Sequence, residues 1–148
     1  MSKLNEVNLV IPGGSKGMIT CTSHAAYYQK VVVHYDVRKE DGSAGGGGKI
    51  DFLGTGEDVI MKTSDGRDNV QIPFANTPAD GQINLTIDFY FSPSKPRRQS
   101  DYQPAKSVRM TPIKAHHHNT IQILSEDSID NDDNDSFLVI YYDDGSNE

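Results

Sequence analysis

The chain has 148 residues with 14 Lys and Arg against 21 Asp and Glu, a net charge of −7, and no basic face interleaved with aromatic residues, which makes nucleic acid a poor partner. One cysteine, Cys21, excludes a disulfide framework and a zinc site built on several thiolates. The longest apolar run, Phe137–Tyr142, is too short for a transmembrane helix, and the N-terminus lacks the apolar stretch of a secretory signal, so we expect a cytoplasmic protein or one released without such a signal.

Short β-strands are predicted wherever apolar and polar residues alternate. The clearest is Ile83–Phe91, in which every odd position is apolar, a pattern that buries one face of a strand. In chain order the predicted strands are Val7–Ile11, Met18–Thr22, Val31–Val37, Lys49–Leu53, Asp58–Lys62, Asn69–Phe74, Ile83–Phe91, Thr120–Leu124 and Ser136–Tyr142. Turn residues separate them, and no window of a dozen residues has a helical period. We therefore predict an all-β fold, a single-domain antiparallel β-sandwich of about nine strands over residues 1–148.

Three segments outside these strands are predicted to be loops. Gly45–Gly48 lacks the following Lys-Ser/Thr of a phosphate-binding loop, so we interpret it as a flexible connector. Ser92–Lys106 contains three prolines and two arginines, which is typical of a loop. His116-His117-His118 is interpreted as a polar loop, because successive side chains of an extended segment point to opposite faces and three of them cannot all face one ion.

The most informative segment is Glu126–Asp135, which contains six carboxylates in ten residues. Like charges about 4 Å apart repel by about 4 kcal/mol near a protein surface, so a folded loop of this kind needs cations. A disordered acidic run is the alternative, but predicted strands fix both ends of the segment. A tethered set of oxygen ligands without imidazole or thiolate suits Ca²⁺.

The acidic segment does not follow the EF-hand pattern. Counted from Asp130, the sixth position is Asp135 where an EF-hand has Gly, and the twelfth is Tyr141 where it has Glu. The carboxylates are also denser than one such loop uses. Two adjacent ions that share bridging carboxylates account for this density.

The pattern Glu126-Asp127-x-x-Asp130-Asn131-Asp132-x-Asn134-Asp135, followed directly by an apolar strand, resembles the calcium loop of the LecB-type bacterial lectins, the fucose/mannose-binding lectin II family. The N-terminal part, from a strand ending in Pro12 through Met18–Ser23 and His24-Ala25-Ala26, matches that family as well. The resemblance implies a small β-sandwich in which two neighbouring Ca²⁺ ions bind a monosaccharide directly, with no catalysis.

The resemblance also assigns roles to individual residues. Glu126, Asp130, Asp132 and Asp135 resemble the ligands of one ion, whereas Asp132, Asn134 and Asp135 resemble those of the other, with Asp132 and Asp135 bridging. Asp127 resembles the carboxylate that accepts hydrogen bonds from the sugar. His24 stands where the family has an Asn that ligates through its backbone carbonyl. Asp133 is a further carboxylate at a position where the family has an aromatic or neutral residue.

Sugar choice in the family follows the short loop after the first metal ligand. Serines there resemble fucose-preferring members, and alanines resemble mannose-preferring ones. This chain has Ala25 and Ala26 followed by Tyr27, so we expect binding of mannose-containing glycans first and fucose-containing glycans second. The sugar-binding set is then Asp127, Ala25, Ala26, Asp132, Asn134 and Asp135. Tyr27 and Tyr28 are expected to pack on the sheet edge rather than stack on a sugar.

The C-terminus departs from the family pattern. Family chains end in a Gly whose carboxylate reaches the calcium site of the partner subunit, and Gly145 aligns with it but is followed by Ser146-Asn147-Glu148. Either Asp143 or Asp144 replaces that carboxylate, or the homodimer implied by the resemblance is different or absent.

Two other functions stay open from the sequence. In the first, calcium only stabilises a structural or adhesin-like sandwich that binds no sugar. In the second, the cluster serves a metal-dependent hydrolase, but calcium activates water poorly and no general base stands apart from the ligands.

Overall fold

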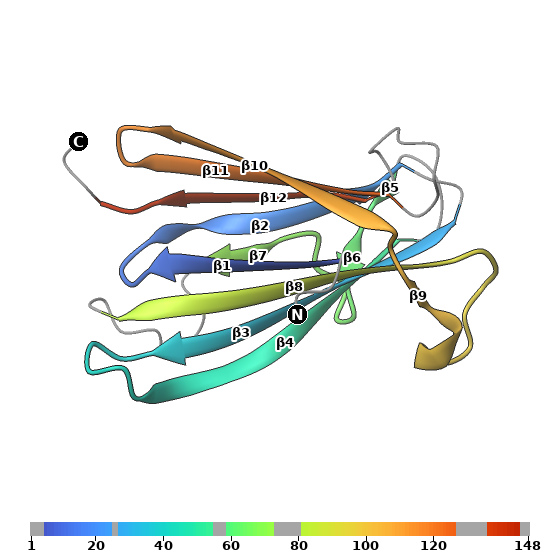
Figure 1. The fold of residues 1–148 in the computed structure, drawn as a ribbon, viewed down its shortest axis with the longest axis horizontal. Coiled ribbons are helices and arrows are strands. Elements are labelled where there is room, and N and C mark those ends of the chain that lie inside the picture. Colours follow the sequence, from blue (N-terminus) through green and yellow to red (C-terminus); the bar gives the residue numbers. More distant parts are fainter. Residues whose placement is uncertain (1–4, 25–26, 55–58, 73–80, 127–135, 146–148) are drawn as a thin grey trace.

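The computed structural model describes residues 5–24, 27–54, 59–72, 81–126 and 136–145. These residues form two antiparallel β-sheets that pack face to face, and the chain passes between the two sheets several times, so each sheet contains strands from both halves of the sequence (Figure 1). The fold class predicted from the sequence, an all-β antiparallel sandwich, is confirmed.

The first sheet has the strand order β1-β8-β3-β4-β6, and β9 pairs with β8 beyond the end of β1. Its long strands alternate apolar and polar residues, so each presents one apolar face to the other sheet. The strands are β1 Glu6–Pro12, β3 Tyr28–Arg38, β4 Ala44–Gly54, β6 Lys62–Thr63, β8 Gln82–Ser92 and β9 Gln103–Pro104.

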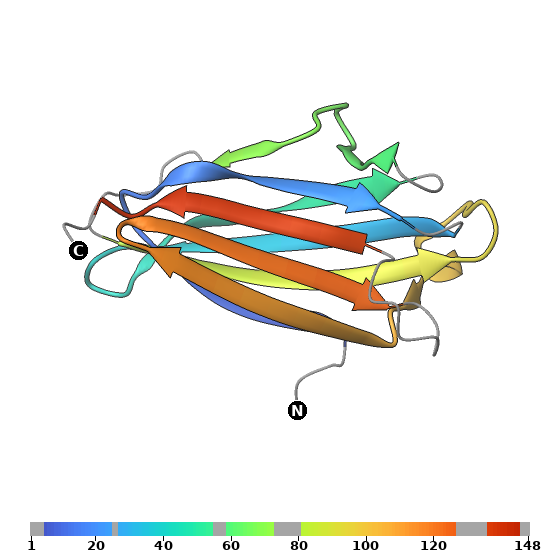
Figure 2. The same cartoon turned by 90° about the horizontal axis from the view of Figure 1, so that it is seen from above.

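The second sheet has the order β10-β11-β12-β2-β5, and β7 also pairs with β2. Figure 2 shows its long strands side by side, in gold, orange, red and blue. The strands are β2 Lys16–Ser23, β5 Val59–Ile60, β7 Val70–Ile72, β10 Ser107–Ala115, β11 His118–Glu126 and β12 Ser136–Asp143.

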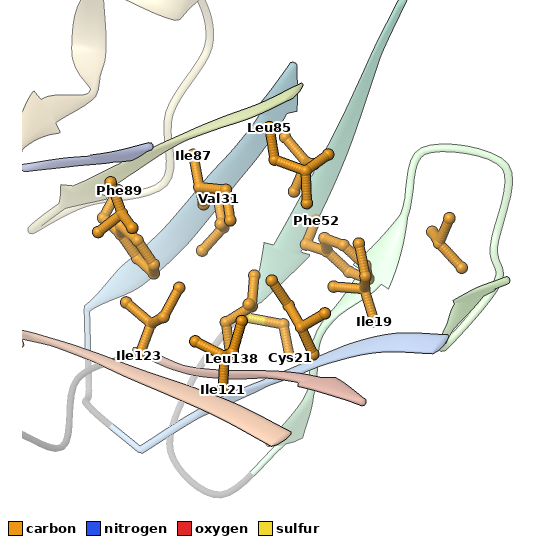
Figure 3. Packing of buried hydrophobic residues seen from close by; sticks show 14 of the residues in the cluster. Ile19, Cys21, Val31, Phe52, Leu85, Ile87, Phe89, Ile121, Ile123 and Leu138 are labelled. Atoms are coloured by element: carbon orange, nitrogen blue, oxygen red, sulfur yellow. The ribbon is translucent and has the colours of Figure 1, made fainter. Parts of the chain in front are cut away.

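The core lies between the two sheets and is built from the inward positions of both. Ile83, Leu85, Ile87 and Phe89 of β8 are fully buried, as the alternation in the sequence predicts. They face an apolar set from the second sheet (Figure 3). That set includes Ile19, Cys21, Ile121, Ile123 and Leu138. Cys21 is a small buried core residue, and burial raises the pKa of its thiol.

The structure differs from the sequence prediction in its count of strands. The described residues contain twelve strands, against about nine expected, because Asp58–Lys62 divides into the short β5 and β6 and two further strands, β9 and β10, were not predicted. β10 is an edge strand whose residues are almost all exposed, so it lacks the alternation that identifies a half-buried strand. The predicted strand Asn69–Phe74 is β7, and residues 58, 73 and 74 lie outside the described part of the chain.

The interpretation of Gly45–Gly48 as a flexible connector was wrong. These glycines belong to β4, and Gly46, Gly47 and Gly48 pair with β3, where Gly48 lies opposite Tyr35. A Cβ on Gly48 would come within 2.7 Å of the Tyr35 hydroxyl oxygen. Gly48 therefore leaves room for the Tyr35 side chain. Ser92–Lys106 is mostly a loop, as predicted, interrupted by β9 and one 3₁₀ turn, η1 Gln99–Asp101.

Across the described residues, no helix is long and apolar enough to cross a membrane.

Candidate functional site

Three strand ends meet at one end of the second sheet, where β11 and β2 finish and β12 begins. Ser125 of β11 pairs with Ser136 of β12, and Ser136 pairs in turn with Ser23 of β2. We call this the site end and define it by Ser23, Ser125, Glu126 and Ser136. Both segments that the sequence assigns to metal and sugar binding, the residues after Ser23 and those between Glu126 and Ser136, start from it (Figure 1).

Glu126 is the described member of the acidic cluster. It is the last residue of β11, and only 1% of its surface is exposed. Its backbone carbonyl accepts a hydrogen bond from the Lys106 N–H at 2.7 Å, which fixes the strand end. Keeping a carboxylate out of water costs free energy that partners or a cation must offset. The burial of Glu126 is therefore compatible with its carboxylate being a metal ligand.

Buried hydrogen bonds connect the site end to the first sheet. The Ser136 hydroxyl donates to Gln29 Oε1 of β3 at 2.8 Å, and the Ser136 N–H donates to Ser125 Oγ at 3.1 Å. Ser23 Oγ is buried as well and has no hydrogen-bond partner among the described residues. A polar, well-fixed platform of this kind is what a loop of closely spaced charges needs at its base.

His24 follows β2 at the site end and is partly exposed. Its Nε2 lies 2.9 Å from Thr22 Oγ1, so its ring turns back toward the strand that it follows. Tyr27 stacks on Phe91 of β8, with ring centroids 5.8 Å apart and 16° between the planes. Tyr27 therefore packs against the first sheet, as expected, but on the inner strand β8 and not on an edge strand.

Most of the predicted site residues lie outside the described part of the chain. Of the predicted set, the structure places Glu126 and His24 at the same end of the second sheet. The others are Asp127, Asp130, Asp132, Asn134, Asp135, Ala25 and Ala26, and their roles stay predictions.

The opposite end of the second sheet carries the His116–His118 segment. Residues 116 and 117 form the turn between β10 and β11, as the loop interpretation predicts, but His118 is already the first residue of β11. The rings of His117 and His118 have centroids 4.1 Å apart. With Asp143 of β12 they make a compact group, which we call the turn end. Sequence reasoning missed it because it treated the segment as fully extended.

Asp143 and Asp144 both have partners within their own chain. Asp143 Oδ1 accepts a hydrogen bond from the Gly145 N–H and lies 2.8 Å from His117 Nδ1. The hydrogen bond from the Gly145 backbone is the larger cause, and the contact with His117 the second, of a pKa of the Asp143 carboxyl below its usual range. Asp144 Oδ2 accepts from Asn119 Nδ2 at 2.9 Å and lies 3.4 Å from Lys114 Nζ.

Comparison with known protein families shows to which family the chain belongs. Residues 8–143 match the family described as "Fucose-binding lectin II (PA-IIL)". The chain belongs to this family. Its members are lectins and not enzymes, so the lectin described here binds carbohydrate, and the family resemblance read from the acidic segment is confirmed.

Solved structures of bacterial lectins share the fold of this lectin. A high-affinity mannose-binding lectin of Ralstonia solanacearum superposes with a TM-score of 0.55 at 19% identity, over 95% of this chain and 96% of that one. The Chromobacterium violaceum lectin CV2L, solved in complex with alpha-methyl-fucoside, gives a TM-score of 0.52 at 15% identity, over 95% and 96%. No curated protein sequence matches the chain significantly.

Proposed function

We propose that this lectin binds a mannose-like monosaccharide, with fucose as the second choice, through two adjacent Ca²⁺ ions held by residues 126–135. The observation that carries the proposal is the register of β11, β12 and β2, which brings both ends of the acidic segment beside the end of β2. A segment fixed at both ends cannot relieve its charge repulsion by spreading out, so bound cations are the remaining way to neutralise it.

The donor set and its base fit calcium. Carboxylate and amide oxygens dominate the segment, and Ca²⁺ takes six to eight oxygens in flexible geometry. In the proposal Glu126, Asp130, Asp132 and Asp135 hold one ion, and Asp132, Asn134 and Asp135 hold the other. The burial of Glu126 supports a polar ligand at the base of the segment, as does the Ser23 hydroxyl, which has no hydrogen-bond partner among the described residues.

His24 contributes its backbone carbonyl in this proposal. Its imidazole already contacts Thr22 Oγ1, so the ring is engaged at the strand. The side chain at position 24 can then differ from the family's Asn without removing the ligand. The proposal predicts that replacing His24 by Asn leaves calcium affinity nearly unchanged.

Sugar hydroxyls are poor ligands by themselves, because a single neutral hydrogen bond gains little over water. Paired calcium ions supply direct coordination of vicinal hydroxyls when they are bound. Asp127 and the calcium-binding carboxylates then accept charge-assisted hydrogen bonds from the same hydroxyls, and these bonds are stronger than neutral ones. Ring stereochemistry decides which hydroxyl pair fits, so the same groups provide selectivity.

The preference for mannose rests on Ala25 and Ala26, which offer no side-chain hydroxyl to the sugar. The names of the two structural neighbours, a mannose-binding lectin and a lectin bound to a fucoside, cover both sugars of the proposal. The homodimer that the family resemblance implies stays a prediction. Sedimentation equilibrium of the purified protein tests it by measuring the mass of the assembly.

The experiment is isothermal titration calorimetry with methyl mannoside and methyl fucoside, in calcium and again after EDTA treatment. We expect both sugars to bind in calcium, mannoside more tightly, and neither to bind after EDTA. Calcium that raises the melting temperature without any sugar binding would instead support the purely structural function. Sugar binding that survives EDTA would refute the calcium mechanism.

A further inference from the structure

The turn end lies at the far side of the molecule from the proposed sugar site. β11 has nine residues, so at about 3.3 Å per residue its two ends are about 26 Å apart. Figure 1 shows the β10–β11 turn at one extremity of the sandwich and the other end of β11 at the opposite one. Chemistry at the turn end is therefore separate from calcium and sugar binding at the site end of the same chain.

The turn reverses the usual alternation of neighbouring side chains. His116 has a φ of 58°, the left-handed conformation that a tight turn uses and that non-glycine residues rarely adopt. His117 completes this turn and lies outside the strand, so its ring comes to lie against that of His118, at 4.1 Å between centroids and 40° between planes. Two imidazoles adjacent in sequence thus share one side of the hairpin.

Asp143 joins the two imidazoles from the neighbouring strand. It is the cross-strand partner of His118, and its Oδ1 lies 2.8 Å from His117 Nδ1. One ligand atom from each of His117, His118 and Asp143 lies within 4.8 Å of the other two. All three side chains are at least partly exposed to solvent, so small side-chain rotations can bring their ligand atoms closer together.

We propose that His117, His118 and Asp143 bind a divalent transition-metal ion, with zinc as its best representative. Zinc bonds of about 2.0–2.1 Å in tetrahedral geometry place neighbouring ligand atoms about 3.3 Å apart. The His117–Asp143 pair, now 2.8 Å apart, would have to open slightly, and the His118 ligand atom, which lies within 4.8 Å of the other two, would have to move closer by at most about 1.5 Å. Two imidazoles and one carboxylate select zinc, nickel or copper over calcium and magnesium, which prefer oxygen ligands. Water completes the coordination.

Tyr141 orients one of the ligands. Its hydroxyl oxygen lies 2.8 Å from His118 Nδ1, and its ring stacks on the His118 ring with centroids 6.0 Å apart. This contact occupies Nδ1 and assigns Nε2 of His118 to the ion, in the way that outer hydrogen bonds commonly fix metal-binding histidines. Tyr141 is thus a positioning residue for the site.

Nearby Asp144 is not part of the proposed ligand set. Its carboxylate accepts a hydrogen bond from Asn119 and pairs with Lys114. It provides a carboxylate control one residue from Asp143. A second control is His34 of β3, whose Nε2 lies 3.6 Å from Asp88 Oδ2 and whose side chain is half exposed. His34 and Asp88 form an imidazole–carboxylate pair like that of His117 and Asp143, but no second imidazole belongs to the pair.

The test is isothermal titration of the metal-stripped chain with zinc chloride in saturating calcium, which keeps the acidic segment filled. We expect one zinc ion per chain, with the affinity reduced at least about tenfold by His118→Ala and by Asp143→Asn, and unchanged by His34→Ala and Asp144→Asn. A Co²⁺ titration followed by visible absorption reports the coordination independently. Circular dichroism melting in EDTA checks that each variant is folded.

Several outcomes would overturn the proposal. Absence of zinc binding by the wild-type chain excludes the site. Equal affinity in Asp143→Asn and wild type means that the exposed histidines chelate without the carboxylate, which refutes the three-ligand site. Because sugar binding is measured separately at the other end, failure of this site leaves the lectin proposal untouched.

Discussion

The two ends of β11 both bring polar side chains together, but they do so in opposite environments. At the site end, Ser23, Ser125, Glu126 and Ser136 are each at most 1% exposed and are tied into the sandwich. At the turn end, His117, His118 and Asp143 are partly or fully open to solvent and are held by contacts among themselves. One end of β11 therefore carries a group of buried, hydrogen-bonded polar side chains, and the other end carries a group of solvent-exposed ones.

This difference separates two ways of presenting ligands. Buried hydrogen bonds are costly to break, so the site end is preorganised for a loop whose charges repel one another. Exposed side chains lose little when they move, so the turn end adapts to an ion by rotation of side chains. The predictions below test whether the two ends really behave independently.

The largest expected effect is at the site end. Asp132→Ala removes the carboxylate proposed to bridge both calcium ions, so calcium and sugar affinity should each fall at least about 100-fold, because even supporting residues commonly contribute about 10–100-fold. Zinc binding at the turn end should not change. Calorimetry with calcium, methyl mannoside and zinc measures all three quantities on one variant.

Asp133→Asn is the matched control for this prediction, since Asp133 is not assigned as a ligand. It should retain calcium and sugar binding. Sugar binding that persists in Asp132→Ala contradicts the bridging role, and loss of zinc binding in the same variant contradicts the independence of the two ends.

The next largest effect concerns the middle of β11, which keeps the two ends apart. Ile123 is fully buried, so Ile123→Ala should lower the free energy of unfolding by about 2–5 kcal/mol. Ile113 on the neighbouring β10 is 51% exposed, and Ile113→Ala should change it by less than about 0.5 kcal/mol. Urea unfolding measures both, and similar losses would show that β10 is packed in solution.

A smaller effect compares one hydrogen bond at each end. Ser136→Ala removes the buried hydrogen bond to Gln29 Oε1 and should destabilise the protein by about 1–3 kcal/mol. Tyr141→Phe removes the contact with exposed His118 and should cost less than about 0.5 kcal/mol. Thermal melting in EDTA compares the two variants. Equal losses of stability would contradict the proposed contrast between a buried end and an exposed end.

The smallest effect is on sugar choice. Ala25→Ser adds a hydroxyl to the loop proposed to set selectivity, so the ratio of mannoside to fucoside affinity should shift toward fucoside by about threefold to tenfold, the value of one net hydrogen bond. Competition calorimetry with the two methyl glycosides gives the ratio directly. An unchanged ratio assigns selectivity to other residues.

The long strands were predictable because each buries one face. Ile83–Phe91 has an apolar residue at every odd position, and all five of those residues are buried. β10 had no such signal, since it forms by pairing with β11 and is exposed on both faces. The glycines of β4 were misread for a related reason. Gly48 lies against the Tyr35 ring of the neighbouring strand, and a local sequence pattern does not contain that contact.

The candidate site divides in the same manner. The acidic segment was recognisable because its charge density is a local property of the sequence. The buried hydrogen bond between Ser136 and Gln29 joins residues 107 positions apart, so only the folded chain reveals it. The turn end depends on the conformation of His116 and on the β11–β12 register, and neither can be read from three consecutive histidines.

The exposure of β10 has a consequence for how the protein behaves when concentrated. An open sheet edge is a template on which another chain can add a strand and begin a fibre. β10 carries Pro112 near its centre, with Arg109 and Lys114 on either side. A proline has no amide hydrogen to donate to an added strand, and charged side chains such as Arg109 and Lys114, the latter paired with Asp144, are a common feature of protected edges. This side of the second sheet is thereby protected against edge-to-edge aggregation, although it lacks a covering strand among the described residues.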